Sequence, residues 1–519
     1  MNGPIKDLKF IIEKNKTAFA IVFLILIGFL IRIQHFQLSN SYPINDGGLF
    51  VTMTRDLIAN NFIIPQYTTY NHLNIPYAYP ALSFYVVGLS NTLTGLEILF
   101  AIKYLPLFYN LLSIPFFYLL AREITNKDTL AFLAAFVFAI SRPSYEWLIM
   151  GGGITRSPAY TFSIITLYLY IHGLRSEKKN NFLLSGVFLG LTAAHHLEKA
   201  QFAWIALLII TFSILDGIRH IKALITVSCI GGLVFLPFFI PVFQFHGLSP
   251  YLNAFGAGEF SLVTPIVKLV MFNFYGITPF IDVFGIFSFI GLISLIIRRN
   301  PHDLFLPLWL VIICVMNPRS VDRFAIIPAS IMFAYGFNIF SNGIRTFFEK
   351  DVQLTFSRIP KSYVAIAALL FVMIFSADFS SKISSPLHFV LTGEDVAAMQ
   401  WVKENTPENA SFAVLPSDFW ASDTVGEWFP SLTERTNVLC TQGTEWLGSF
   451  GMMQETHKLF EEQIVELEIH EVLRELDLNV DHIYCSENQL ESLIPNCPAE
   501  IDGFDVIYDQ PGVMIYRSH

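Results

Sequence analysis

Residues 17–36 read TAFAIVFLILIGFLIRIQHF, and this stretch decides the fold of the chain. It contains one arginine, Arg32, and is otherwise almost entirely apolar. A helix of this length crosses the roughly 30 Å hydrocarbon core of a bilayer. No small-residue cleavage site follows it, so we expect a retained span rather than a removed leader. The lysines among residues 6–16 predict a cytoplasmic N-terminus.

The composition extends this interpretation to the whole chain. Of the 519 residues, 53% are hydrophobic, only 14% are charged, and 51 are Phe. Soluble domains do not have such a composition, so we expect a polytopic α-helical membrane protein. The net charge of −10 is unevenly divided, because residues 379–519 hold 24 Asp and Glu against six Lys and Arg. We therefore predict two domains, a transmembrane domain at 1–378 and an acidic domain at 379–519.

About eleven apolar segments are predicted to be spans, and the basic residues between them set their orientation. The segments are 17–36, 97–120, 128–142, 157–173, 182–195, 199–215, 221–242, 277–297, 303–316, 324–341 and 362–378. The basic loops at 122–127, 175–179, 219–222, 298–299 and 345–361 then all face the cytoplasm. The apolar stretch 81–94 is too short to cross, so we place it on the outer surface, together with 260–276. Eleven spans put the C-terminal domain outside.

The acidic region has the pattern of a small α/β domain. Short β-rich runs lie at 411–415, 482–485, 506–508 and 513–516, and an acidic helix covers 454–476. Cys440, Cys485 and Cys497 lack metal-ligand spacing, so one disulfide among them is expected if the domain is extracytoplasmic. The sequence leaves the pairing open.

Residues suited to chemistry gather in the loops that this topology places outside. The first loop contains Ile44-Asn45-Asp46-Gly47-Gly48-Leu49-Phe50 and Tyr79. The later outer loops contain Glu146, Arg156, His195, His196, Arg319 and Arg323, and Lys103 lies near the outer end of the second span. A carboxylate at a water-membrane boundary beside two glycines is typical of a reaction centre. Arginine is the side chain best shaped for phosphate.

Carboxylates, imidazoles and arginines at one boundary suit transfer of a group from an anionic lipid to a hydroxyl or amine. The sequence shows no ATP-type phosphate loop or Gly-x-Ser-x-Gly elbow beside them, so the energy has to come from an activated donor. Simpler interpretations stay open: Asp46 as a helix N-cap, Glu146 as a solvated acid, Arg319 and Arg323 as headgroup anchors, and Lys103 as a snorkelling cation.

Several of these motifs resemble the GT-C superfamily of membrane glycosyltransferases. They are the acid after the first span, the stretch Tyr77-Ala78-Tyr79-Pro80-Ala81-Leu82, and Gly152-Gly153-Ile154-Thr155-Arg156 in the second outer loop. In the acidic domain, Met399 to Pro407 and Gly426-Glu427-Trp428-Phe429-Pro430 are similar to soluble domains of uncharacterised members. Members of this superfamily use polyprenyl-phosphate sugars. The Trp-Trp-Asp signature of its oligosaccharyltransferases is absent from this sequence.

The resemblance implies that Asp46 is the catalytic acid, acting as general base, with Glu146 as the second acid. We assign the donor phosphate to Arg319, Arg323, Lys103 and Arg156, and the acceptor to Tyr79, His195 and His196. Some members hold a divalent ion. Whether Asp46, Glu146 and His195 bind Mg²⁺ or Mn²⁺ here is left open, and no other cofactor is expected.

These assignments predict an inverting glycosyltransferase of the plasma membrane. It takes a sugar from a dolichyl- or undecaprenyl-type phosphate donor to an extracytoplasmic glycan, lipid or protein acceptor, and no nucleic-acid partner is expected. Two other functions stay open: a multi-pass transporter of a lipid-linked or small anionic substrate, and a ligase that moves a whole glycan from a lipid carrier. Charged residues are nearly absent from the middle of the spans, which disfavours the transporter.

Overall fold

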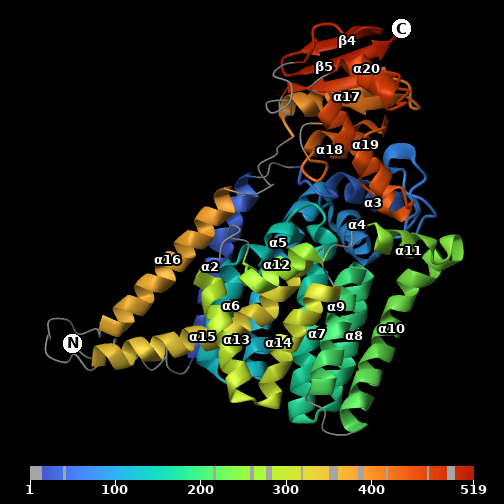
Figure 1. Ribbon diagram of the computed structural model, residues 1–519. Coiled ribbons are helices and arrows are strands. Elements are labelled where there is room, and N and C mark those ends of the chain that lie inside the picture. The colour runs from blue at the N-terminus through green and yellow to red at the C-terminus, as the bar shows by residue number, and fades with distance from the viewer. Residues whose placement is uncertain are drawn as a thin grey trace.

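The computed structural model describes residues 15–38, 42–213, 218–257, 262–275, 283–316, 320–349, 361–383, 391–416, 419–464, 467–487 and 497–519. Figure 1 shows a bundle of long helices with a smaller domain, drawn in orange and red, beyond one end. The short helices α3 (Gly47–Ala59) and α4 (Leu82–Thr94) lie between the bundle and this domain. Both belong to the predicted first outer loop.

Each predicted span coincides with a helix. These helices are α2 (Lys16–Leu38), α5 (Ile98–Thr125), α6 (Asp128–Ile140), α7 (Gly153–Ser176), α8 (Lys179–His195), α9 (Leu197–Ser213), α10 (Ile218–His246), α13 (Val283–Arg298), α14 (Pro301–Met316), α15 (Val321–Glu349) and α16 (Lys361–Ile383). Within the described residues, four helices, α2, α5, α10 and α15, contain a stretch long and apolar enough to cross a membrane. How many of the others cross, and which side each loop faces, stay predictions.

Two further short helices lie in the chain between α10 and α13. They are α11 (Ser249–Gly256) and α12 (Val263–Met271). The predicted surface stretch 260–276 contains α12, just as 81–94 contains α4. Figure 1 shows α11 beside the end of α10 that lies nearer the C-terminal domain.

The arginine of the first span is buried, and its donors are satisfied. The Arg32 guanidinium donates to Asn110 Oδ1 in α5 at 2.5 Å, to the carbonyl oxygen of Ala139 in α6 at 2.6 Å, and to the Ser144 hydroxyl at 3.2 Å. A buried cation is costly unless it is hydrogen-bonded, and these bonds explain how the span accommodates it. They also join three helices close to the loop that carries Glu146.

The acidic region forms the predicted α/β domain. Its strands are β1 (Ser411–Val414), β2 (Thr436–Asn437), β3 (His482–Ser486), β4 (Phe504–Gln510) and β5 (Val513–Ser518), in the order β2-β1-β3-β5-β4. The pairs β1–β2 and β1–β3 are parallel, and β5 is antiparallel to β3 and to β4. The helices of this domain are α17 (Gly393–Asn405), α18 (Thr424–Thr433), α19 (Phe450–Gln463) and α20 (Ile469–Glu475). Only the two-residue strand β2 was not predicted.

The predicted acidic helix at 454–476 is wrong in its continuity. It corresponds to two helices, because α19 ends at Gln463 and α20 begins at Ile469. Glu468 and Glu471 form a capping box at the start of α20. Glutamate favours both helix interiors and first turns, so a Glu-rich pattern does not show where one helix ends and the next begins.

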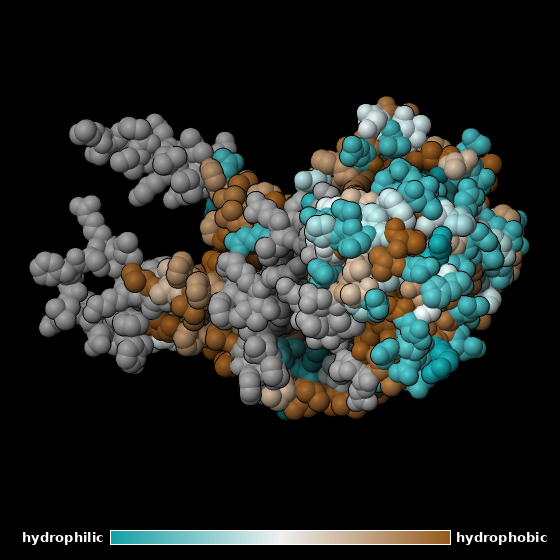
Figure 2. Space-filling view, turned by 90° about the horizontal axis from the view of Figure 1, so that it is seen from above, coloured by the Kyte–Doolittle hydropathy of each residue, from teal (hydrophilic) through white to brown (hydrophobic). Residues whose placement is uncertain are grey.

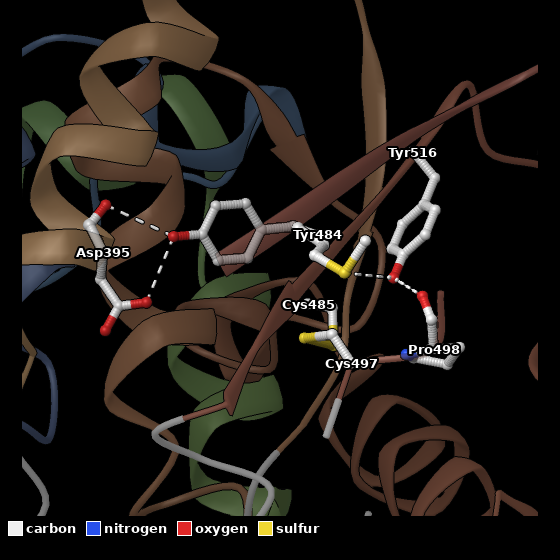
Figure 3. The surroundings of a disulfide bond; sticks show 7 residues. Asp395, Tyr484, Cys485, Cys497, Pro498 and Tyr516 are labelled. Carbon is white, nitrogen blue, oxygen red and sulfur yellow. Dashed lines mark hydrogen bonds between the residues drawn. A yellow bond between two sulfur atoms is a disulfide. The ribbon is translucent and has the colours of Figure 1, made fainter. Parts of the chain in front are cut away.

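Cys485 in β3 and Cys497 form a disulfide, one of the pairings that the sequence left open. Figure 3 shows Tyr516 beside this bond, with its hydroxyl donating to the carbonyl oxygen of Pro498, the residue after Cys497. The disulfide and this hydrogen bond together tie the segment before β4 to the sheet.

The C-terminal domain and the predicted first outer loop share one hydrophobic core. Leu49 and Phe50 of α3 are buried in the same cluster as Trp428 and Phe429 of α18. The helix α18 packs directly on α3. A residue of the C-terminal domain therefore lies close to Asp46, which precedes α3.

Candidate active site

Asp46 lies in a turn with an unusual backbone conformation. Asn45 and Asp46 have φ angles of 68° and 76°, and α3 begins at the next residue, Gly47. This left-handed region is unfavourable for residues with a side chain, although Asn and Asp tolerate it best. A Cβ on Gly151 would lie 2.5 Å from the Cα of Gly47, so glycines are needed where the loops around these two residues meet. The Gly152 N–H donates to the Asn45 carbonyl oxygen at 2.5 Å.

The side chain of Asp46 does not cap α3. It makes no cap hydrogen bond, and its Oδ2 instead forms an ion pair with Arg156 in the first turn of α7. A second nitrogen of the same guanidinium donates to Asn45 Oδ1. The planar arginine fork therefore holds two consecutive side chains. Asp46 thus occupies the N-cap position of α3 without a side-chain cap bond, and its side chain, at 16% exposure, stays accessible from solvent.

Tyr79 lies beside this pair and belongs to the same predicted outer loop as Asp46. It interacts electrostatically with both Asp46 and Arg156. Its ring lies 5.2 Å from the Trp446 ring of the C-terminal domain and 6.2 Å from the His196 imidazole. Burial raises the pKa of Tyr79 and lowers the pKa of His196. Both side chains are therefore neutral hydrogen-bonding groups at physiological pH.

The second carboxylate beside Asp46 comes from the C-terminal domain. Glu427 in α18 is buried, and its two oxygens accept from the backbone N–H groups of Asn45 at 2.7 Å and Gly48 at 3.3 Å. Burial and the charge of Asp46 raise the pKa of Glu427 to about 8, although the backbone N–H groups act in the opposite direction. The predicted partner of Asp46, Glu146, interacts with other groups.

Glu146 belongs to a cluster around Arg323 in the first turn of α15. The Arg323 guanidinium lies 4.9 Å from the centre of the Trp147 ring and interacts electrostatically with Glu146. Glu146 Oε2 forms an ion pair with Arg142 at 2.7 Å, and its buried Oε1 has no hydrogen-bond partner among the described residues. Burial raises the pKa of Glu146, and the two arginines oppose this shift.

His196, Glu198 and Lys199 connect the two clusters. The Lys199 ammonium is fully buried and binds Glu198 Oε2 at 2.6 Å. Both His196 and Lys199 interact electrostatically with Arg156 and with Arg323. Arg156, Lys199 and Arg323 occupy the first turns of α7, α9 and α15. Three cations therefore meet where three helix N-termini, which carry partial positive charge, also meet.

Other predicted site residues have separate partners or lie beyond the described ranges. His195 places its Nδ1 at 2.6 Å from the Ser83 hydroxyl, and its ring lies 5.6 Å from that of Phe162. Lys103 is half-buried near the start of α5, and its role stays a prediction. Arg319 lies outside the described residues.

The three predicted metal ligands do not come together. Asp46 is paired with Arg156, Glu146 with Arg142, and His195 with a serine. In the part of the chain that the structure describes, no three His, Cys, Asp or Glu side chains form a group that could hold a metal ion. Divalent cations such as Mg²⁺ need carboxylates free to coordinate them, and these carboxylates face arginines. Asp46, Glu146 and His195, as the structure places them, therefore do not form a site for a divalent ion.

Glu427 and Lys199 were not predicted as site residues. Glu427 is part of the Gly426–Pro430 motif, but it lies 382 residues from Asn45, and no local pattern links the two. Lys199 follows the run His195-His196-Leu197-Glu198, which was a usable signal. A charged residue at the start of an apolar helix is a functional hypothesis by default.

Comparisons with known proteins show which solved structures have a similar fold. No protein-family model matches the sequence, and no curated protein matches it either. Among solved structures, an oligosaccharyltransferase from Archaeoglobus fulgidus, tethered with an acceptor peptide, matches 98% of this chain and 74% of its own, at 14% identity and a TM-score of 0.59. ArnT from Cupriavidus metallidurans, bound to undecaprenyl phosphate, matches 95% of this chain and 97% of its own, at 12% identity and a TM-score of 0.54.

A third structure agrees with these two. The arabinofuranosyltransferase AftD from Mycobacteria matches 97% of this chain and 41% of its own, at 13% identity and a TM-score of 0.51. The similarity covers both the helical bundle and the C-terminal domain of this chain. The fold is therefore similar to that of GT-C membrane glycosyltransferases, which confirms the resemblance that the sequence motifs indicated.

Proposed function

We propose that this protein is an inverting glycosyltransferase that moves a sugar from a polyprenyl-phosphate donor to an extracytoplasmic acceptor. One juxtaposition carries the proposal: the accessible carboxylate of Asp46 lies in one polar region with the cations Arg156, Lys199 and Arg323. A proton acceptor and an anion-binding group are the two elements that transfer from a lipid phosphate requires. The similar folds support this proposal.

The donor phosphate binds at Arg323, with Lys199 and Arg156 as neighbouring cations. Lys199 is buried, and a buried cation attracts an anion more strongly than an exposed one. The helix N-termini at this place add to the positive potential. A structure of ArnT contains undecaprenyl phosphate, and one of the Archaeoglobus fulgidus oligosaccharyltransferase contains dolichol-phosphate. We infer a donor of the same lipid-phosphate class.

Asp46 acts as the general base. Arg156 binds its Oδ2, and no hydrogen bond to its Oδ1 is found within the described residues. Oδ1 takes the proton of the acceptor hydroxyl or amine as that oxygen or nitrogen attacks the anomeric carbon. The bond from this carbon to the phosphate oxygen breaks, and its electron pair leaves with the polyprenyl phosphate. Attack opposite the leaving group inverts the anomeric carbon, while Tyr79 and His196 contact the acceptor.

We also propose that the eleven helices span the membrane and that residues 379–519 form an extracytoplasmic domain beside a catalytic domain at 1–378. A disulfide between Cys485 and Cys497 suits an oxidising compartment. Seen from above in Figure 2, the face over the C-terminal domain is mostly hydrophilic, and apolar residues gather beside it. Since α18 packs on α3, this domain lies on the same side of the membrane as Asp46.

A transfer assay tests the proposal. Purified protein is incubated with undecaprenyl-phosphate and dolichyl-phosphate monosaccharides labelled in the sugar, together with an envelope extract as acceptor. The expected result is transfer of label to a product with release of the polyprenyl phosphate. Uptake of label into sealed proteoliposomes without transfer would identify a transporter. Transfer only from a lipid-linked oligosaccharide would identify a glycan ligase.

A further inference from the structure

We propose that Glu427 is a positioning residue that caps α3 in place of Asp46 and thereby leaves the Asp46 carboxylate available for proton transfer. The C-terminal domain then completes the active site instead of only covering it. This inference rests on the proposed role of Asp46 as general base.

The carboxylate of Glu427 occupies the position that a capping side chain normally takes. The first N–H groups of a helix have no partner within the helix, and a side-chain oxygen of the N-cap residue usually accepts from one of them. In this protein the residue at the N-cap position, Asp46, makes no such bond. Glu427 Oε1 accepts from the Gly48 N–H at 3.3 Å, and Oε2 accepts from the Asn45 N–H at 2.7 Å. The two hydrogen bonds of the Glu427 carboxylate therefore lie on either side of Asp46 in the sequence.

The conformation of this turn makes outside support necessary. Asn45 and Asp46 both have positive φ angles, which a short peptide rarely adopts at two consecutive non-glycine residues. Glu427 holds the turn from one side, and the N–H of Gly152 holds the Asn45 carbonyl oxygen from the other. Both supports come from distant parts of the chain.

The two carboxylates divide two tasks that one side chain cannot perform together. A capping aspartate turns its side chain back toward the second and third residues of the helix, whereas the Asp46 carboxylate points to Arg156. Because Glu427 already accepts from the N-terminus of α3, Asp46 is released to form this ion pair. The structure thus explains why Asp46, although it is at the N-cap position, makes no side-chain hydrogen bond to α3.

The surroundings of Glu427 fix its backbone as well as its side chain. The Tyr70 hydroxyl donates to the Glu427 carbonyl oxygen at 2.6 Å, and the indole N–H of Trp428 donates to the Pro43 carbonyl oxygen at 3.2 Å. A Cβ on Gly48 would lie 2.8 Å from the Glu427 carbonyl oxygen. Such close packing holds the carboxylate within reach of the turn.

Hydrogen exchange of the full-length protein in detergent tests the inference without any donor. In Glu427→Ala, we expect the backbone N–H groups of residues 44–50 to exchange roughly ten-fold faster, because they lose a buried acceptor. The control Ser431→Ala removes a 3.0 Å hydrogen bond to Thr52 in the same α18–α3 contact and should leave this segment unchanged. Equal exchange in the parent and Glu427→Ala would overturn the inference. If Glu427→Ala does not fold, Glu427→Gln replaces it in the experiment. This variant keeps one acceptor oxygen, so we expect a smaller acceleration of exchange at residues 44–50. Exchange in Glu427→Gln equal to that of the parent would also overturn the inference.

Activity measurements distinguish positioning from simple stabilisation. We expect Glu427→Ala to lower kcat roughly ten-fold or more, with binding of undecaprenyl phosphate within about two-fold of the parent. In an Asp46→Asn background the same change should have little further effect, because it acts through Asp46. A full additional loss in that background would show that Glu427 acts by another route. If the parent transfers no sugar, the proposed function fails, while hydrogen exchange still decides the role of Glu427.

Discussion

Arg156 binds Asp46, which lies 110 residues earlier in the chain, and with a second nitrogen it binds Asn45. The ion pair joins the proposed base to one of the cations that face the proposed phosphate site. It also engages only one carboxylate oxygen of Asp46. The orientation of the base therefore depends on the fork geometry of arginine, and not on its charge alone.

Replacing Arg156 with lysine tests this dependence. Lysine keeps the charge but lacks the planar fork that binds Asn45 and Asp46 through two separate nitrogens, so Arg156→Lys should lower kcat roughly ten-fold or more with little change in thermal stability. Steady-state transfer and thermal unfolding measured on the same preparation check both statements. A turnover close to that of the parent would show that charge alone is sufficient.

Asp46→Asn keeps the size and hydrogen-bonding capacity of the side chain but cannot accept the proton. Transfer should fall by roughly 10² or more, in line with general-base contributions. Folding should change little, because Asp46 makes no cap bond. The measurement is sugar transfer by an Asp46→Asn preparation whose unfolding temperature matches that of the parent. Near-normal transfer by this preparation would refute the assignment of Asp46 as the base.

Arg323→Lys should weaken binding of the donor rather than of the acceptor. Loss of one charge-assisted hydrogen bond to phosphate corresponds to roughly a ten-fold loss of affinity. Titration with undecaprenyl phosphate measures the effect. Arg175→Lys is a matched control, since Arg175 lies at the other end of α7 and its nearest ion-pair contact, with Glu123, is 3.9 Å long. Equal donor affinity in Arg323→Lys and this control would refute the phosphate role.

The pKa of Glu427 predicts a pH dependence of stability. A glutamate carboxyl normally titrates near 4.5, whereas burial and the charge of Asp46 raise the pKa of Glu427 to about 8. Between these two values the folded state binds more protons than the unfolded state, so this group makes stability fall as pH rises from about 4.5 to about 8. The unfolding temperature of Glu427→Gln should therefore fall less steeply over this range than that of the parent. Parallel curves would show that Glu427 does not titrate there.

The disulfide predicts both a stability effect and a location. The bond closes a separation of 12 residues, so Cys485→Ser should destabilise the C-terminal domain by about 3 kcal/mol. Thermal unfolding with and without a reducing agent measures this. A C-terminal reporter that is active only in the cytoplasm should stay silent, and strong activity would place the domain on the cytoplasmic side and change the number of spans.

The sequence by itself determined the helices and the α/β character of the C-terminal domain, and it led to the proposal that the loop around Asp46 is a site. These features depend on local patterns: long apolar runs such as 17–36, alternating residues in short strands, and a carboxylate beside Gly47 and Gly48. Hydropathy and backbone preference act over a few residues, so one sequence is enough to show them.

Only the tertiary structure decided which charged groups meet. Glu146 was the predicted partner of Asp46, yet Glu427 takes that place from 382 residues beyond Asn45, and Glu146 pairs with Arg142. Side-chain partners across such distances follow from how α18 packs on α3 and from which loops converge, and no local pattern encodes that convergence. The same packing buries Glu427 and leaves Asp46 accessible, which is the difference between the proposed capping carboxylate and the proposed base.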